Sequence, residues 1–181
     1  MYFLRQKKIL INVCIMAFLW MAGSFNYYLI QFLINTFQAI YITGIVSSIS
    51  DIVANSIAAY VFEKIGVRKC ISGSQALATV GGLLVLTYGL QHDQSWTFPL
   101  LVMMSKFGVT FTFNTLYVSH ATLFPVLFAS SAMGINQFVA RLFSAISPLL
   151  AQIQEPVPMI VFTSITTTSF ILAFFIQTED R

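Results

Sequence analysis

The chain has 181 residues, of which 57% are hydrophobic and only 8% are charged, and its formal net charge is +3. A soluble domain usually contains about 25% charged residues, so this composition, with a mean hydropathy of +0.83, excludes an ordinary soluble core and predicts a protein embedded in lipid. Nucleic-acid binding is excluded because the sequence has no basic run.

The N-terminal segment begins with basic residues and continues as a long apolar run. A secretory signal peptide has an apolar region of about 7–15 residues. Here the run extends to Leu33, and no clear Ala-x-Ala cleavage site ends it. The segment is therefore predicted to be a retained first span.

Six stretches of the chain are long and apolar enough to form membrane helices, which need about 20 residues. The breaks between them have physical causes: a charged turn surrounds Gly66, and Pro125 and Pro156 each remove a backbone donor. The predicted fold class is an all-α membrane protein with a single domain over residues 1–181. Its predicted transmembrane helices cover residues 9–33, 38–62, 70–90, 97–121, 128–151 and 157–176.

The Lys and Arg residues outside these spans predict the orientation, because cytoplasmic loops carry an excess of both. If the spans alternate, all of these residues fall on one side, and the opposite loops contain none. Both termini are therefore predicted to be cytoplasmic. The residues concerned are Arg5, Lys7, Lys8, Lys64, Arg68, Lys69 and Arg181.

Three charged residues, Asp51, Lys106 and Arg141, lie deep inside the apolar runs. Each costs roughly 2.5–3.5 kcal/mol in hydrocarbon and is kept mainly where it faces a partner or a water-filled path. At about 1.5 Å per residue, Asp51 and Arg141 share a depth near the bilayer midplane, and this predicts that they pair. Lys106 is then either a second positive centre or a side chain that extends toward the outer interface.

A series of short motifs gives the sequence a family resemblance. In chain order they are Trp20, Phe25-Asn26-Tyr27-Tyr28, Asp51 twelve residues before Glu63, Lys106-Phe107-Gly108, Phe113-Asn114, Ala121-Thr122-Leu123-Phe124-Pro125, Met133-Gly134, Ala140-Arg141-Leu142 and Ser147-Pro148. Their order and spacing resemble the second half of the organic cation/anion transporter family of the major facilitator superfamily. The resemblance implies the C-terminal six-helix half of a twelve-helix bundle, with a substrate site at the midplane.

The resemblance also implies a function, namely transport of organic ions by alternating access. Members that prefer anions tend to carry arginine at the position of Arg141, which favours an anionic or zwitterionic substrate here. Implied substrate-binding residues are Arg141, Lys106, Asn26, Tyr28, Asn114 and Gln137. Asp51 would balance charge or couple to protons, and Glu63, Lys64, Gly66 and Arg68 would form a gating loop.

The implied partners are the lipid bilayer, a small organic ion, and an N-terminal six-helix half or another membrane subunit. The plasma membrane is the favoured location, with an internal membrane as the alternative. No cofactor is expected, and no motif of an enzyme is present.

Two departures from the family pattern leave a second function open. Thr122 stands where the family has a glutamate, and Ala129 where it has an arginine. The loss of both would weaken a cytoplasmic latch. The alternative is therefore a truncated, non-transporting membrane subunit that packs in a larger assembly.

Individual residues also have structural alternatives. Arg141 could serve only as the partner of Asp51, and the aromatic side chains Trp20, Tyr27 and Phe113 could serve only in helix packing. For His120, near the cytoplasmic end of its span, an interfacial position is favoured over a proton relay.

Overall fold

The computed structural model describes the backbone of residues 2–34, 40–88, 97–124 and 126–176, and the side chains of these residues except 2–9, 40, 121 and 126–128. The predictions about Arg5, Lys7, Lys8, Arg181 and the loops near 35–38 and 91–96 lie outside what is described.

The described chain is helical, which confirms the all-α fold class. The helices are α1 (Tyr2–Leu33), α2 (Ile40–Ile65), α3 (Val67–Thr87), α4 (Thr97–Leu123), α5 (Val126–Ser144), α6 (Ser147–Ala151) and α7 (Val157–Ala173).

Three helical segments in the described residues are long and apolar enough to cross a membrane: Leu10–Leu33, Tyr41–Ile65 and Val67–Thr87. Val157–Ala173 is a shorter apolar helix. Helix α4 is not among the three, and its hydropathy is lowered by a lysine and several hydroxyl and amide side chains. The membrane character is therefore confirmed, and the number of six spans stays a prediction.

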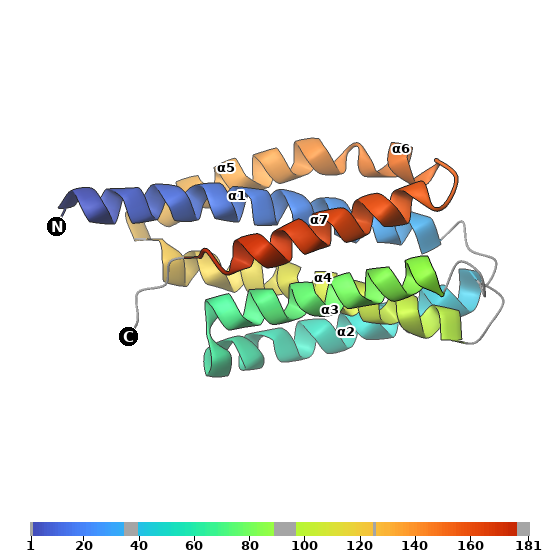
Figure 1. The fold of residues 1–181 in the computed structure, drawn as a ribbon. Helices are drawn as coiled ribbons and strands as arrows, with labels where there is room; N and C mark the ends of the chain where they lie inside the picture. Colours follow the sequence, from blue (N-terminus) through green and yellow to red (C-terminus); the bar gives the residue numbers. More distant parts are fainter. Residues whose placement is uncertain (1, 35–39, 89–96, 125, 177–181) are drawn as a thin grey trace.

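The helices form two groups (Figure 1). Helices α1, α5 and α6 pack together on one side, and α2, α3 and α4 pack together on the other. Helix α7 contacts both α1 and α3, and α4 contacts both α1 and α5, so α4 and α7 join the groups. Helix α5 packs mainly on α1, which places it on the far side of α1 from α2.

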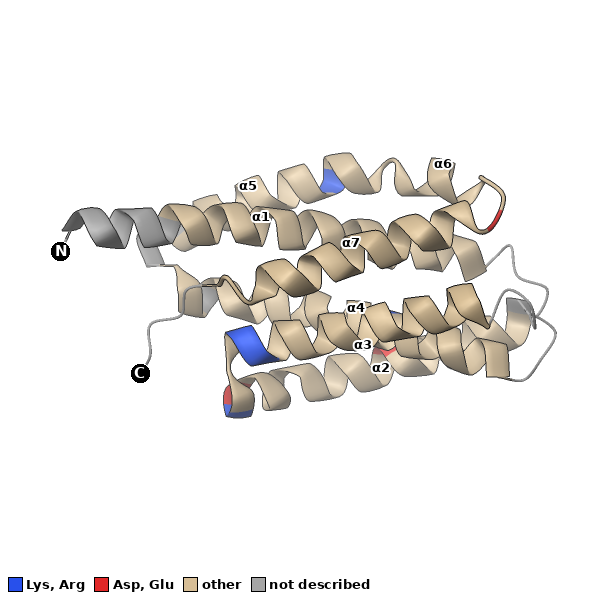
Figure 2. Cartoon of the chain, in the orientation of Figure 1, with Lys and Arg blue, Asp and Glu red and all other residues tan. Residues whose placement is uncertain are grey.

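Charged side chains are sparse along the described helices and gather at the turn between α2 and α3 (Figure 2). Helix α1 begins, and α7 ends, at this same end of the bundle (Figure 1). The turn needs only one non-helical residue, Gly66, whose φ of 78° is a conformation that favours glycine. Its N–H donates to the Phe62 carbonyl at 2.9 Å, which ends α2.

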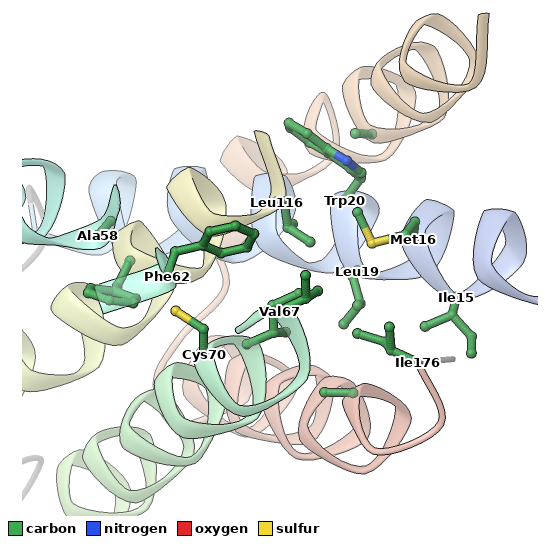
Figure 3. Packing of buried hydrophobic residues seen from close by; sticks show 14 of the residues in the cluster. Ile15, Met16, Leu19, Trp20, Ala58, Phe62, Val67, Cys70, Leu116 and Ile176 are labelled. Carbon is green, nitrogen blue, oxygen red and sulfur yellow. The ribbon is translucent and has the colours of Figure 1, made fainter. Parts of the chain in front are cut away.

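Apolar side chains of α1 form much of the core between the two groups (Figure 3). Met16, Leu19 and Trp20 are buried and belong to one cluster with Phe62 of α2 and Leu116 of α4. Because these side chains come from both groups, the cluster holds α1 against the α2–α4 side of the bundle.

Glycines allow a close approach between α3 and α4. A Cβ atom on Gly108 would lie 2.6 Å from the Ser74 carbonyl oxygen, and one on Gly81 would lie 2.6 Å from Ser105 Oγ. Small residues at such contacts are typical of packed membrane helices.

The helix is interrupted within the fifth predicted span, residues 128–151, and the span itself stays a prediction. Helix α5 ends at Ser144 and α6 begins at Ser147. Pro148 has no N–H to donate to the Ser144 carbonyl; the Ser147 hydroxyl donates to that carbonyl instead, at 2.7 Å. The break therefore lies one turn after Arg141.

Candidate functional site

Helices α2 and α4 are joined by a ladder of polar contacts. Lys106 Nζ donates to Ser47 Oγ at 2.6 Å, and Thr110 Oγ1 donates to Asp51 Oδ1 at 2.7 Å. One turn further along, the Asn114 amide donates to the Asn55 amide oxygen. Each pair is separated by 59 residues, so the two helices run parallel and in register.

An ion pair crosses this ladder. Lys106 Nζ lies 2.9 Å from Asp51 Oδ2, with the lysine side chain 2% exposed and the aspartate side chain 21% exposed. Lys106 also donates to Gln31 Oε1 of α1 at 2.5 Å. The lysine charge is thus neutralised and held by side chains from two other helices, α1 and α2.

The predicted Asp51–Arg141 pair was wrong. The prediction rested on depth along the membrane normal, and depth does not say which helices are neighbours. Helix α4 lies against α2 and supplies Lys106, whereas α5 packs on α1. The Lys106 side chain is buried inside the bundle. The alternative that it extends toward the outer membrane interface is therefore wrong as well.

Arg141 has a different environment on α5. Its side chain is exposed, and its Nη1 donates to Tyr28 Oη of α1 at 2.6 Å. One turn earlier, Gln137 Nε2 donates to Tyr117 Oη of α4 at 2.9 Å. In the described part of the chain no carboxylate pairs with Arg141, so its positive charge is available to a ligand or partner.

Aromatic rings occupy the space between the two cations. The Tyr27 ring stacks on Phe113 at a centroid distance of 6.0 Å and meets Tyr28 edge-on at 5.5 Å. Phe113 contacts Tyr117 at 5.4 Å, and Lys106 Nζ lies 5.5 Å from the centre of Tyr27. We call Tyr27, Tyr28, Phe113 and Tyr117 the aromatic wall.

Arg141, Lys106, Tyr28, Asn114 and Gln137 thus all contact this wall or the ladder beside it. Asn26, the remaining predicted substrate-binding residue, is only 1% exposed, and its Oδ1 has no hydrogen-bond partner among the described residues. The structure therefore places Asn26 inside the bundle, away from the exposed side chains.

The predicted gating residues lie at the α2–α3 turn. Lys64 Nζ lies 4.4 Å from the centre of the Tyr60 ring, and the Arg68 guanidinium lies 5.8 Å from the centre of the ring of Phe174, the residue that follows α7. Glu63 and Gly66 are exposed. Arg68 thus links this turn to the end of α7, and a gating role stays a prediction.

His120 was predicted to be interfacial, and this was wrong. The residue is 3% exposed and contacts Trp20 of α1 and Asn136 of α5. Its position near one end of α4 suggested the interface, but helices on both sides cover it.

Sequence reasoning missed several residues of the ladder, namely Gln31, Ser47, Asn55 and Thr110, and also missed Tyr117. A signal was present. Polar residues recur every four positions at 47, 51 and 55 and again at 106, 110 and 114, which puts each set on one helix face. Two matching polar stripes in apolar helices predict a pair of helices that face each other.

The site has the chemistry of binding. It offers a cation, amides, hydroxyl groups and aromatic faces, and the described residues contain no group of three or more His, Cys, Asp or Glu that could hold a metal ion. Such a set can neutralise an anionic group and cover an apolar body.

Comparison with known proteins points to transporters. The chain is 29% identical to mouse solute carrier family 22 member 4 over 95% of its own length and 34% of that protein's. It is 27% identical to human organic cation/carnitine transporter 2 (96% of the chain, 31% of the relative) and 24% identical to a fruit-fly organic cation transporter protein (94% and 30%). The chain thus spans about a third of the length of these relatives. No protein-family model matches it.

The names of these relatives are those of transporters and not of enzymes. Together with the three helices that are long and apolar enough to cross a membrane, they support an integral, multi-pass membrane protein. The family resemblance of the motifs is confirmed: the chain is similar in sequence to solute carrier family 22 and organic cation transporters.

Proposed function

We propose that the chain is the C-terminal six-helix half of an organic-ion transporter, and that it moves an organic anion or zwitterion by alternating access. The relatives' names support organic ions as the general class. The motif order supports the second half of the transporter, where the substrate site lies between the halves.

The observation that carries the anion preference is the contrast between the two cations. Asp51 already neutralises Lys106, whereas Arg141 is exposed and bonded to a neutral tyrosine hydroxyl. A guanidinium group has five N–H donors in a planar fork, so Arg141 can bind a carboxylate while one N–H stays on Tyr28. The aromatic wall then contacts the apolar part of the substrate.

Asp51 is proposed to balance charge. Its carboxylate accepts hydrogen bonds from both Lys106 and Thr110, and the lysine supplies the opposite charge. This favours charge balance over proton coupling for Asp51.

An N-terminal half, from another segment or another chain, is the proposed partner. Helix α2 leaves a broad apolar face exposed that includes Ile45, Ile49 and Ile52, and α5 leaves another that includes Phe138 and Leu142. Lipid can cover apolar side chains, but Arg141 in hydrocarbon would be costly. A second half that encloses a water-filled cavity removes this cost, and the α2–α3 turn is the proposed gate.

The test is to change the charge at position 141 and measure binding of two labelled probes, benzoate and tetraethylammonium, to the chain in lipid nanodiscs. Loss of a charged hydrogen bond of about 1.5–3 kcal/mol predicts that Arg141→Gln weakens benzoate binding roughly 10- to 100-fold. Arg141→Asp should reverse the preference toward tetraethylammonium. Arg68→Gln removes a cation outside the site and should change neither affinity. Unchanged benzoate binding by a folded Arg141→Asp protein would contradict the proposal.

The second candidate function is the non-transporting subunit. Thr122 and Ala129 favour it, because the family's acid and base at these positions are both replaced. Uptake of either probe by cells that make the chain together with its partner half would exclude this function. A stable membrane complex without uptake would support it.

A further inference from the structure

A buried polar cluster joins three helices behind the aromatic wall. Trp20 Nε1 of α1 donates to His120 Nε2 of α4 at 2.7 Å, and the Asn136 amide of α5 lies 3.4 Å from the same nitrogen. Trp20 and Asn136 are 0% exposed and His120 is 3% exposed. No residue of this cluster is in the proposed binding site.

The chemistry of this contact fixes the state of the imidazole. An indole N–H can only donate, so His120 Nε2 must accept, and a doubly protonated imidazolium could not do so. His120 Nδ1 has no partner in the described structure. His120 is therefore held as a neutral hydrogen-bond acceptor, and Trp20 and Asn136 donate to it.

The indole that His120 holds is in contact with the aromatic wall. Trp20 meets Tyr117 edge-on at a centroid distance of 4.5 Å and Phe113 at 5.3 Å. Tyr117 in turn carries the hydroxyl group that accepts from Gln137. A chain of direct contacts thus runs from His120 through Trp20 to the exposed side of the wall.

We propose that His120 is a positioning residue that sets the orientation of the Trp20 indole and, through it, of Tyr117 and Gln137 in the binding site. This inference rests on the proposed function for its effect on substrate, but the contact from His120 to Tyr117 is testable without substrate. Loss of the acceptor leaves a buried indole N–H without a partner, and the ring turns to find one.

The test compares three single variants and one double variant. His120→Leu removes the acceptor, and Trp20→Phe removes the donor. His120→Gln keeps an acceptor near the position of Nε2. The double variant His120→Leu with Trp20→Phe measures whether the two residues act as one unit, because residues in one contact give non-additive effects.

The first readout is the fluorine NMR signal of Tyr117 in protein labelled with 3-fluorotyrosine, assigned by its loss in Tyr117→Phe. The signal should move in His120→Leu and in Trp20→Phe, return toward the wild-type position in His120→Gln, and move no further in the double variant. A Tyr117 signal that stays unchanged when Trp20 is replaced, or that moves equally in His120→Gln and His120→Leu, would overturn the proposal. Trp20→Phe and His120→Gln decide the question even if His120→Leu does not fold.

The second readout is benzoate affinity in nanodiscs. We expect about a tenfold loss in His120→Leu, the equivalent of about 1.4 kcal/mol, and recovery in His120→Gln. If wild-type protein binds no benzoate, the proposed anion preference fails, but the NMR comparison still decides whether His120 positions Tyr117. If Tyr117 moves and affinity does not change, the proposed role in binding is wrong.

Discussion

The α2–α4 pair and the α1–α5 pair each hold one cation, but they surround it differently. Lys106 is buried, paired with Asp51 and bonded to Ser47 and Gln31. Arg141 is exposed and bonded to a tyrosine hydroxyl. The first arrangement satisfies the charge inside the chain, and the second leaves it available to something outside the chain.

The region around Lys106 is also more closely packed than the region around Arg141. Between α3 and α4 a Cβ on Gly108 would meet backbone atoms at 2.6 Å, whereas on α5 a Cβ on Gly134 would meet nothing within 4 Å. The α2–α4 side is thus closed and the α5 side is open. The comparison teaches that a charge in a membrane helix has to be interpreted together with the packing around it.

The largest effect that distinguishes the two environments is expected when Lys106 is replaced. Lys106→Met should destabilise the protein by about 3 kcal/mol, because it leaves the Asp51 carboxylate without its partner in a largely buried place. Thermal unfolding in detergent measures the change. Arg141→Met, on the open side, should cost much less.

A matched double variant separates the lost charge pair from lost packing. Lys106→Met with Asp51→Asn removes both charges and should recover much of the stability, since neutral replacement of a buried pair is often tolerated. If the double variant is no more stable than Lys106→Met, the ion pair is not what holds α2 to α4.

A smaller effect is expected from the glycines. Gly108→Val forces α3 and α4 apart and should cost about 1–3 kcal/mol, measured by the same unfolding transition. Gly134→Ala places its methyl group in open space and should leave stability unchanged or slightly raised, because alanine favours helix. Equal losses in the two variants would show that α5 is packed as closely as α4.

Much of the fold could be predicted from the sequence, because apolar runs and their breaks are local features. Gly66 ends α2 as predicted, and the described helices fall within the predicted stretches or within a few residues of their ends, except that α1 begins at Tyr2, before the predicted start at residue 9. The sequence contains Pro148 inside the fifth predicted span. Whether a proline kinks or breaks a membrane helix depends on which group replaces the lost backbone hydrogen bond. Here Ser147 does so, and the sequence pattern did not indicate it.

The site was predicted less well, because its contacts depend on which helices are neighbours. Residue depth placed Asp51 and Arg141 at one level but could not show that α4 lies next to α2. The interior position of His120 depends on Trp20 and Asn136, which come from helices distant in the sequence. Only the ladder had a sequence signal, in its repeated four-residue spacing.

The smallest effect concerns the carboxyl group of Glu155, which lies between α6 and α7. Asp51 is paired with a lysine, and Glu155 has no such partner among the described residues. Both of its oxygen atoms are buried without a hydrogen bond in the described structure, and burial raises the pKa of this carboxyl group above its ordinary 4.5. The folded protein therefore binds this proton more tightly than the unfolded chain does. The contribution to stability is most favourable below pH 4.5, falls as pH rises through the folded-state pKa, and is constant above it.

Replacing Glu155 by glutamine removes this titration and should raise stability at neutral pH by at most about 1 kcal/mol, because the neutral amide no longer places an ionised group at a buried position. Unfolding midpoints across the acidic range should be flatter in Glu155→Gln than in wild type. Glu63→Gln, which changes an exposed carboxyl group at the α2–α3 turn, should leave the pH profile as it is. A profile unchanged by Glu155→Gln would mean that this carboxylate has a partner in the membrane that compensates its charge as Lys106 compensates Asp51.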